Sequence, residues 1–128
     1  MTQPLIASSL TVLNDLRDHV YDVAASKGFH DPDQDAMGMP KYIANLHGEV
    51  TELWDAFRAD TLDKPCDKAA KMLAAGTPVL TCAEEEIADI LIRALDVAKA
   101  YSIDVAHAVA AKDAYNQTRP QRHGGKKA

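Results

Sequence analysis

Residues 81–98 read TCAEEEIADILIRALDVA, and this stretch decides the fold. Thr81 followed by Glu84 has the S/T-x-x-E form of a capping box, in which the two side chains satisfy backbone groups at the start of a helix. Apolar side chains then recur every three or four residues, at Ile87, Leu91, Ala94, Leu95 and Ala98. We therefore expect a long helix whose apolar stripe faces the core.

Three further stretches have the same helical spacing of apolar residues, at about 8–27, 40–58 and 104–118. Gly28 is suited to end the first of them, Pro40 to begin the second and Asp104 to cap the last. Turn-forming residues predict loops over 29–39 and 59–80, with room for a short helical piece within 67–75. No stretch alternates in the manner of a strand, so we predict an all-α four-helix bundle.

Composition favours one helical domain over residues 1–128. The chain is 47% hydrophobic but only 5% aromatic, with few glycines and prolines, and this balance favours helix over sheet. The formal net charge of −5 argues against general binding to nucleic acid. The C-terminal tail from about residue 119 is basic, in contrast to the net negative charge of the whole chain. It contains Arg119, Arg122, His123, Lys126 and Lys127.

The sequence predicts a cytoplasmic location. No apolar run approaches the roughly 20 residues that cross a bilayer, and the first residues lack the charged-then-apolar order of a signal peptide. Cys66 and Cys82 lack the spacing of zinc ligands or of a redox motif, so we expect them to be reduced thiols. We expect no stable nucleic-acid or membrane partner.

Two carboxylate pairs are the strongest indication of chemistry: Glu49 with Glu52, and Glu86 with Asp89. Three residues are almost one helical turn, so each pair projects from one face of its helix. If the two helices pack together, four carboxylates converge, and a hard cation that binds oxygen can neutralise them. A single pair is more often a solvated helix face, but two pairs beside apolar stripes predict a site for Mg²⁺, with Mn²⁺ as a substitute.

The last predicted helix carries candidates for binding a phosphate. Lys112 and Asn116 lie one turn apart, and Arg119 follows at the end of the helix. A cation and an amide at this spacing can contact phosphate oxygens across a metal site, although a surface lysine would look the same. Trp54, beside the first carboxylate pair, is a candidate for stacking on a base, with core packing as the alternative.

Three segments together resemble the MazG-like nucleotide pyrophosphohydrolases. They are LHGEVTELWDAFR at 46–58, EEIADILIRALD at 85–96 and KDAYNQTRPQRHGGKK at 112–127. The similarity covers about residues 40–127, and the last segment has the K-x-x-Y-N-x-x-R-P-x-x-H-G form of a small stand-alone branch. Gly48 stands where many relatives have a second acid, and Gln121 stands where an aromatic residue is usual.

The resemblance implies an all-α fold, a homodimer or homotetramer, and Mg²⁺-dependent cleavage of a nucleoside triphosphate to monophosphate and pyrophosphate. Glu49, Glu52, Glu86 and Asp89 match the metal-binding and catalytic carboxylates of the family. Lys112, Asn116 and Arg119 match its polar positions on the last helix. The reaction would be attack of a metal-activated water at the α-phosphorus, and dGTP and dCTP are the first substrates to try.

Two other readings stay open at the level of sequence. A phosphoribosyl-ATP-type pyrophosphohydrolase shares this helical superfamily and similar acids. A catalytically silent bundle that senses nucleotides or promotes assembly would keep the fold without the reaction. The base, the sugar and the number of metal ions are not fixed by these residues.

Overall fold

The computed structural model describes residues 7–127, and the regular structure over that range is helical, as predicted. The elements are a 3₁₀ turn η1 and seven helices: η1 Ala7–Leu10, α1 Thr11–Ser26, α2 Pro32–Asp35, α3 Met39–Arg58, α4 Ala69–Ala74, α5 Cys82–Ala100, α6 Val105–Thr118 and α7 Arg122–Gly125. An isolated bridge between Pro65 and Thr81 joins the two ends of the segment that carries α4. Within the described range, no helix is both long and apolar enough to cross a membrane.

The capping residues act at the helix ends where the sequence places them. The Thr81 hydroxyl accepts a hydrogen bond from the Glu84 backbone N–H at 3.2 Å, and the Glu84 carboxylate accepts one from the Thr81 N–H at 3.0 Å. The Asp104 carboxylate likewise accepts from the His107 N–H at the start of α6. Gly28 follows α1 with a φ of +85°, a conformation that glycine adopts at little cost.

The predicted loops contain more helix than expected. Pro32 begins the one-turn helix α2 inside the 29–39 segment, because Asp31 is extended and proline has a φ suited to the first helical position. The helical piece predicted within 67–75 is present as α4. The tail bends once at α7, where His123 and Gly124 leave helical geometry.

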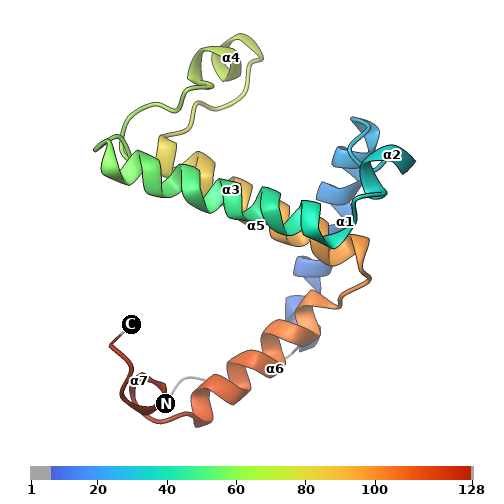
Figure 1. Ribbon diagram of the computed structural model, residues 1–128, viewed down its shortest axis with the longest axis vertical. Coiled ribbons are helices and arrows are strands. Elements are labelled where there is room, and N and C mark those ends of the chain that lie inside the picture. Colours follow the sequence, from blue (N-terminus) through green and yellow to red (C-terminus); the bar gives the residue numbers. More distant parts are fainter. Residues whose placement is uncertain (1–6, 128) are drawn as a thin grey trace.

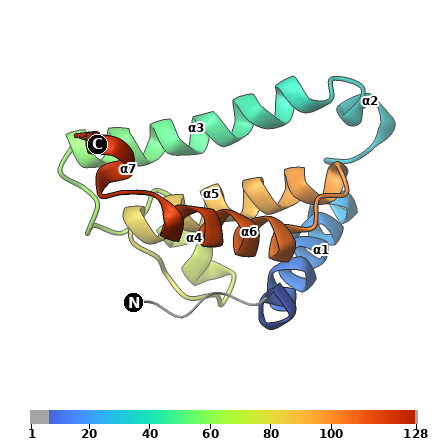
Figure 2. The same ribbon diagram turned by 90° about the horizontal axis from the view of Figure 1, so that it is seen from below.

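Two helix pairs, α3 with α5 and α1 with α5, make most of the contacts between the helices of the fold. α3 and α5 lie antiparallel along most of their length, and α1 packs across the second half of α5 (Figures 1 and 2). α6 packs mainly against η1 and α1 and leads away from α3 (Figure 1). A single chain therefore does not close a four-helix bundle, and the bundle stays a prediction for an assembly.

The buried core of one chain is small. The buried apolar residues are Val20, Tyr42, Cys66, Leu95, Ala98 and Ala106. The apolar stripes of α3 and α5 were expected to face inward, but several of their members are exposed: Ile43, Val50, Phe57, Ile87 and Leu91. The expectation was wrong for the single chain because α6 does not cover this face.

A buried histidine joins the segment after α1 to α3 and α5. The side chain of His30 is 3% exposed, with Nδ1 3.0 Å from an Asp35 oxygen and Nε2 2.7 Å from an Asp96 oxygen. Its ring stacks between those of Tyr21 and Tyr42, at centroid distances of 4.0 and 5.7 Å. Burial favours the neutral ring, but hydrogen bonds to Asp96 and Asp35 outweigh this effect and raise the pKa of His30 above 6.5.

Stability should therefore depend on pH through His30. A raised folded-state pKa gives stabilisation that is complete below the unfolded value of about 6.5 and is lost as pH rises through the folded value. We expect His30→Gln to lose more free energy of unfolding at pH 6 than at pH 9, as measured by urea denaturation. An equal loss at both pH values would show that the charge on His30 does not contribute.

Candidate functional site

Three carboxylates from two helices meet at the contact between α3 and α5. Glu49 and Glu52 project from α3, Glu86 projects from α5, and one oxygen of each lies within 4.8 Å of the others. Glu49 and Glu52 are one turn apart, so the antiparallel packing of α5 brings Glu86 against both. The predicted convergence of the first pair with the second is confirmed for these three side chains.

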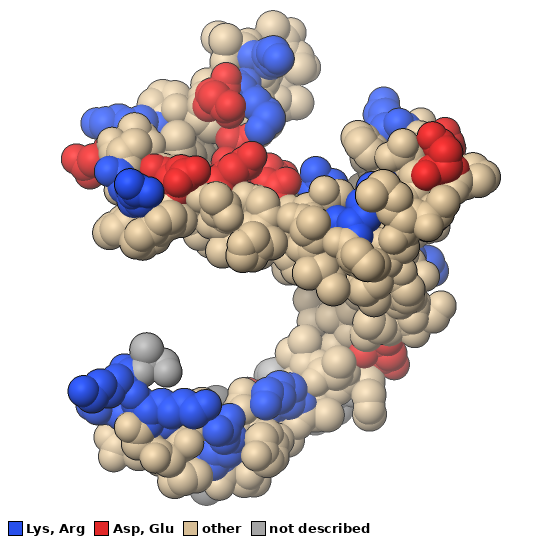
Figure 3. Space-filling model, in the orientation of Figure 1, with Lys and Arg blue, Asp and Glu red and all other residues tan. Residues whose placement is uncertain are grey.

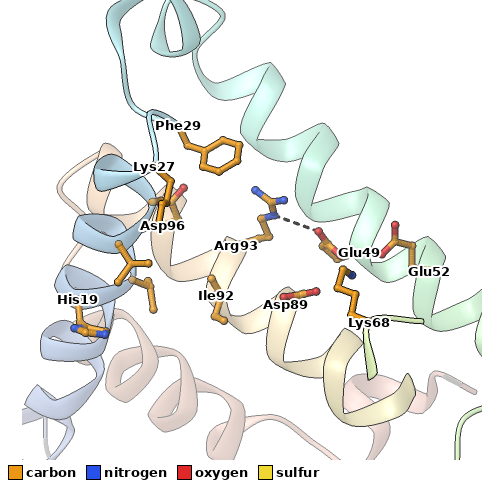
Figure 4. A pocket seen from close by; sticks show the side chains of 13 residues that line it. His19, Lys27, Phe29, Glu49, Glu52, Lys68, Asp89, Ile92, Arg93 and Asp96 are labelled. Atoms are coloured by element: carbon orange, nitrogen blue, oxygen red, sulfur yellow. Dashed lines mark hydrogen bonds and ion pairs between the residues drawn. The ribbon is translucent and has the colours of Figure 1, made fainter. Parts of the chain in front are cut away.

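Asp89 completes the acidic group on the α1 side. It lies one turn after Glu86, and it lines the same cavity as Glu49 and Glu52 (Figure 4). Burial, followed by the charges of Glu49 and Glu85, raises the pKa of Asp89. Glu49 and Glu52 therefore connect the two acids of α5: they meet Glu86 at the helix contact and share the cavity with Asp89.

Glu86 is the most constrained of the four carboxylates. Glu86 is only 8% exposed, and its Oε2 has no hydrogen-bond partner among the described residues. Burial and the neighbouring Glu52 raise the pKa of Glu86 to about 7, and desolvation followed by Glu49 raises that of Glu52. A buried carboxylate oxygen without a partner is costly, and a cation would satisfy it.

The donor set fits Mg²⁺. It consists of oxygens alone, it carries several negative charges, and two helices hold it in place. Glu49, Glu52 and Glu86 would hold the ion, with Asp89 beside them. Among the described residues, this set contains no histidine or cysteine, the residues that zinc prefers as ligands.

Two cations flank the carboxylates, and the sequence analysis selected neither as a site residue. The Nε atom of Arg93, one turn after Asp89 on α5, donates to Glu49 at 3.2 Å. Lys68, just before α4, pairs with the buried Glu85. The i, i+4 spacing from Asp89 could have indicated Arg93. No sequence signal indicates Lys68, because only the path of the α4 segment brings it to α5.

A cavity of about 650 Å³ extends from the carboxylates toward α1. Glu49, Glu52, Asp89 and Lys68 lie at one end (Figure 4). The other end is mixed, with Phe29 and apolar side chains of α1 and α5 beside His19, Lys27 and Asp96. Its size is typical of a pocket for a small molecule. A carboxylate-rich end, and a mixed end that includes the Phe29 ring, suit a ligand that has a metal-bound charged part and a ring.

The remaining predicted residues lie elsewhere in the chain. Lys112 and Arg119 lie over the Tyr115 ring, with the Lys112 Nζ 4.9 Å and the Arg119 Cζ 5.6 Å from its centroid. Trp54 is exposed and stacks on Phe57, outside the acidic cavity. The structure does not bring these residues to the carboxylates within one chain.

The acidic and basic side chains gather on different elements of the molecule. Acidic side chains gather along α3 and α5, whereas lysines and arginines cover the arm formed by α6 and α7, with an open gap between the two (Figure 3). Lys112 and Asn116 line one shallow surface on this arm. The predicted phosphate-binding residues of the last helix therefore belong to a basic arm, remote from the acidic site of the same chain.

Comparisons with protein-family models, curated proteins and solved structures gave no match to this chain. The similarity to the MazG-like enzymes therefore rests on the three sequence segments alone.

Removing the charge of Glu86 should stabilise the metal-free protein. Its pKa rises from 4.5 to about 7 on folding, so the cost of ionising it in the folded state grows between those pH values and is complete above them. We compare the free energy of unfolding of Glu86→Gln with that of the unmodified protein. We expect this difference to be about 1–3 kcal/mol more favourable to the variant at pH 8 than at pH 5.

The measurement is urea denaturation in EDTA, with Glu84→Gln as the control. Glu84 lies on the same helix, but its pKa is lowered by the capping box. That substitution should destabilise the protein at pH 8. A gain at pH 8 no larger than that at pH 5 in Glu86→Gln would contradict the repulsion described for this site.

Proposed function

We propose that this protein is a Mg²⁺-dependent nucleoside triphosphate pyrophosphohydrolase. The observation that carries the proposal is the group formed by Glu49, Glu52 and Glu86, in which a buried oxygen of Glu86 has no partner. Glu49 and Glu52 of this group also line a cavity large enough for a nucleotide. The resemblance of the three sequence segments to MazG-like enzymes supports the same activity.

The proposed reaction breaks one phosphoric anhydride bond. A water oxygen bonds to the α-phosphorus, the bond between that phosphorus and the bridging oxygen breaks, and pyrophosphate leaves with the electron pair. Bound Mg²⁺ would polarise the phosphoryl oxygen and lower the pKa of the attacking water. Glu49, Glu52, Glu86 and Asp89 would hold the ion in a fixed position relative to the phosphate.

We also propose that the active form is a homo-oligomer. The exposed stripes of α3 and α5 present Ile43, Val50, Ile87 and Leu91 to solvent in one chain, and symmetric pairing would bury them and close the predicted four-helix bundle. Lys112, Asn116 and Arg119 lie on a basic arm, and the body is acidic (Figure 3). In an oligomer this arm could reach the carboxylates of a neighbouring copy.

The products test the reaction class. A purified sample supplied with dGTP or dCTP and Mg²⁺ should give the monophosphate and pyrophosphate, and EDTA should abolish turnover, because the carboxylates alone repel the triphosphate. Glu49→Gln and Asp89→Asn should each lose most of the kcat while staying folded. Chromatography identifies the products, and circular dichroism checks the fold.

Diphosphate and orthophosphate as first products would overturn this reaction class. Full activity of either variant at limiting Mg²⁺ would overturn the assignment of the metal site.

Assembly is tested by mass in solution. Light scattering at micromolar concentration should give a multiple of the 13.9 kDa chain mass. Leu91→Glu, on the exposed face of α5, should shift the protein toward the monomer because it buries a charge in the interface. Leu73→Glu is the matched control, since Leu73 is an exposed leucine on α4, away from that face. A 13.9 kDa particle for the unmodified protein would contradict the proposal.

A further inference from the structure

Two basic side chains stand on opposite flanks of the acidic site and line the same cavity. Arg93 lies on the α1 side and Lys68 on the α4 side, with Asp89 between them (Figure 4). Lys68 pairs with the buried Glu85 and, at 3.8 Å, with the exposed Asp67. Arg93 pairs with Glu49, one of the three clustered carboxylates. The site is therefore an acidic centre with a cation on either side.

Both cations have hydrogen-bonding capacity left for a ligand. The side chain of Lys68 is 51% exposed and that of Arg93 is 39% exposed, although both have a carboxylate partner. A lysine has three donors and an arginine has five, so these ion pairs do not exhaust either group. Both side chains line the cavity that holds Glu49, Glu52 and Asp89.

The Glu85 carboxylate and the closed α4 segment hold Lys68 in place. Glu85 is only 4% exposed, and a buried carboxylate needs a partner to remain charged. The Pro65–Thr81 bridge and the hydrogen bond from the Cys66 N–H to the Leu80 carbonyl close the α4 segment directly beside Lys68. The ammonium group is thus fixed next to the carboxylates rather than carried on a free loop.

We propose that Lys68 and Arg93 bind the polyphosphate of the substrate, one from each side of the carboxylate-held metal. The inference rests on the proposed function and deepens it. A polyphosphate that lies over a metal at Glu49, Glu52 and Glu86 presents its outer oxygens to both flanks, where charge-assisted hydrogen bonds are available. A single chain then supplies its own phosphate contacts, independently of the distant arm that carries Lys112.

Binding of inorganic tripolyphosphate in the presence of Mg²⁺, followed by calorimetry, tests this assignment without requiring turnover. Lys68→Met and Arg93→Gln should each raise the dissociation constant about tenfold or more, which is the effect of losing one charge-assisted hydrogen bond. Lys71→Met is the matched control, because Lys71 is an exposed lysine of the same segment that does not line this cavity. It should change affinity by less than about twofold.

A second variant separates phosphate binding from a purely structural ion pair. Glu85→Gln removes the same ion pair but keeps the Lys68 ammonium group, and the Pro65–Thr81 bridge still closes its segment. Tripolyphosphate should therefore bind as tightly as before or more tightly. Thermal unfolding of each variant in EDTA reports any loss of the pair's structural contribution. Equal weakening by Glu85→Gln and Lys68→Met would overturn the assignment of Lys68.

The inference and the proposed function fail separately. If tripolyphosphate binding depends on Lys68 and Arg93 while no nucleoside triphosphate is cleaved, the inference stands and the proposed function falls. If triphosphates are cleaved while both variants keep the affinity of the unmodified protein, the inference falls and the function stands. Absence of Mg²⁺-dependent tripolyphosphate binding in the unmodified protein overturns the inference.

Discussion

The antiparallel contact between α3 and α5 is the constraint on which the rest of the structure depends. It forces Glu49 and Glu52 against Glu86, an arrangement that costs free energy because like charges repel and one buried oxygen lacks a partner. The raised pKa of Glu86 is the direct sign of that cost. This contact lowers the free energy of unfolding of the metal-free protein, and a cation bound there would raise it again.

The packing of α6 accounts for the open shape of one chain. α3 and α5 direct their carboxylates to one side, and their apolar stripes remain exposed on another because α6 packs on α1 instead. A small core and large exposed apolar side chains are typical of a subunit rather than of a complete monomer. The proposed oligomer would cover the stripes and bring a basic arm to an acidic body.

Local rules predicted the helix ends and the carboxylate pair on each helix, because their causes lie within a few residues. Thr81 with Glu84 and Gly28 after α1 act through nearby backbone groups, and i, i+3 spacing alone puts Glu49 and Glu52 together. The direction of α6 was not predictable, since it follows from the turn at Ser102, where φ is +56°. Nor were His30 and Lys68, whose partners Asp96 and Glu85 are 66 and 17 residues away.

The central claim is that the carboxylates of α3 and α5 form a metal site, and Mn²⁺ binding tests it most directly. Electron paramagnetic resonance can follow the titration of Mn²⁺ into metal-free protein, with the double variant Glu52→Gln, Glu86→Gln as the comparison. The account predicts saturable binding by the unmodified protein and its loss in the double variant, while circular dichroism shows both to be folded. Equal Mn²⁺ binding by the two proteins, or none by either, would contradict the account.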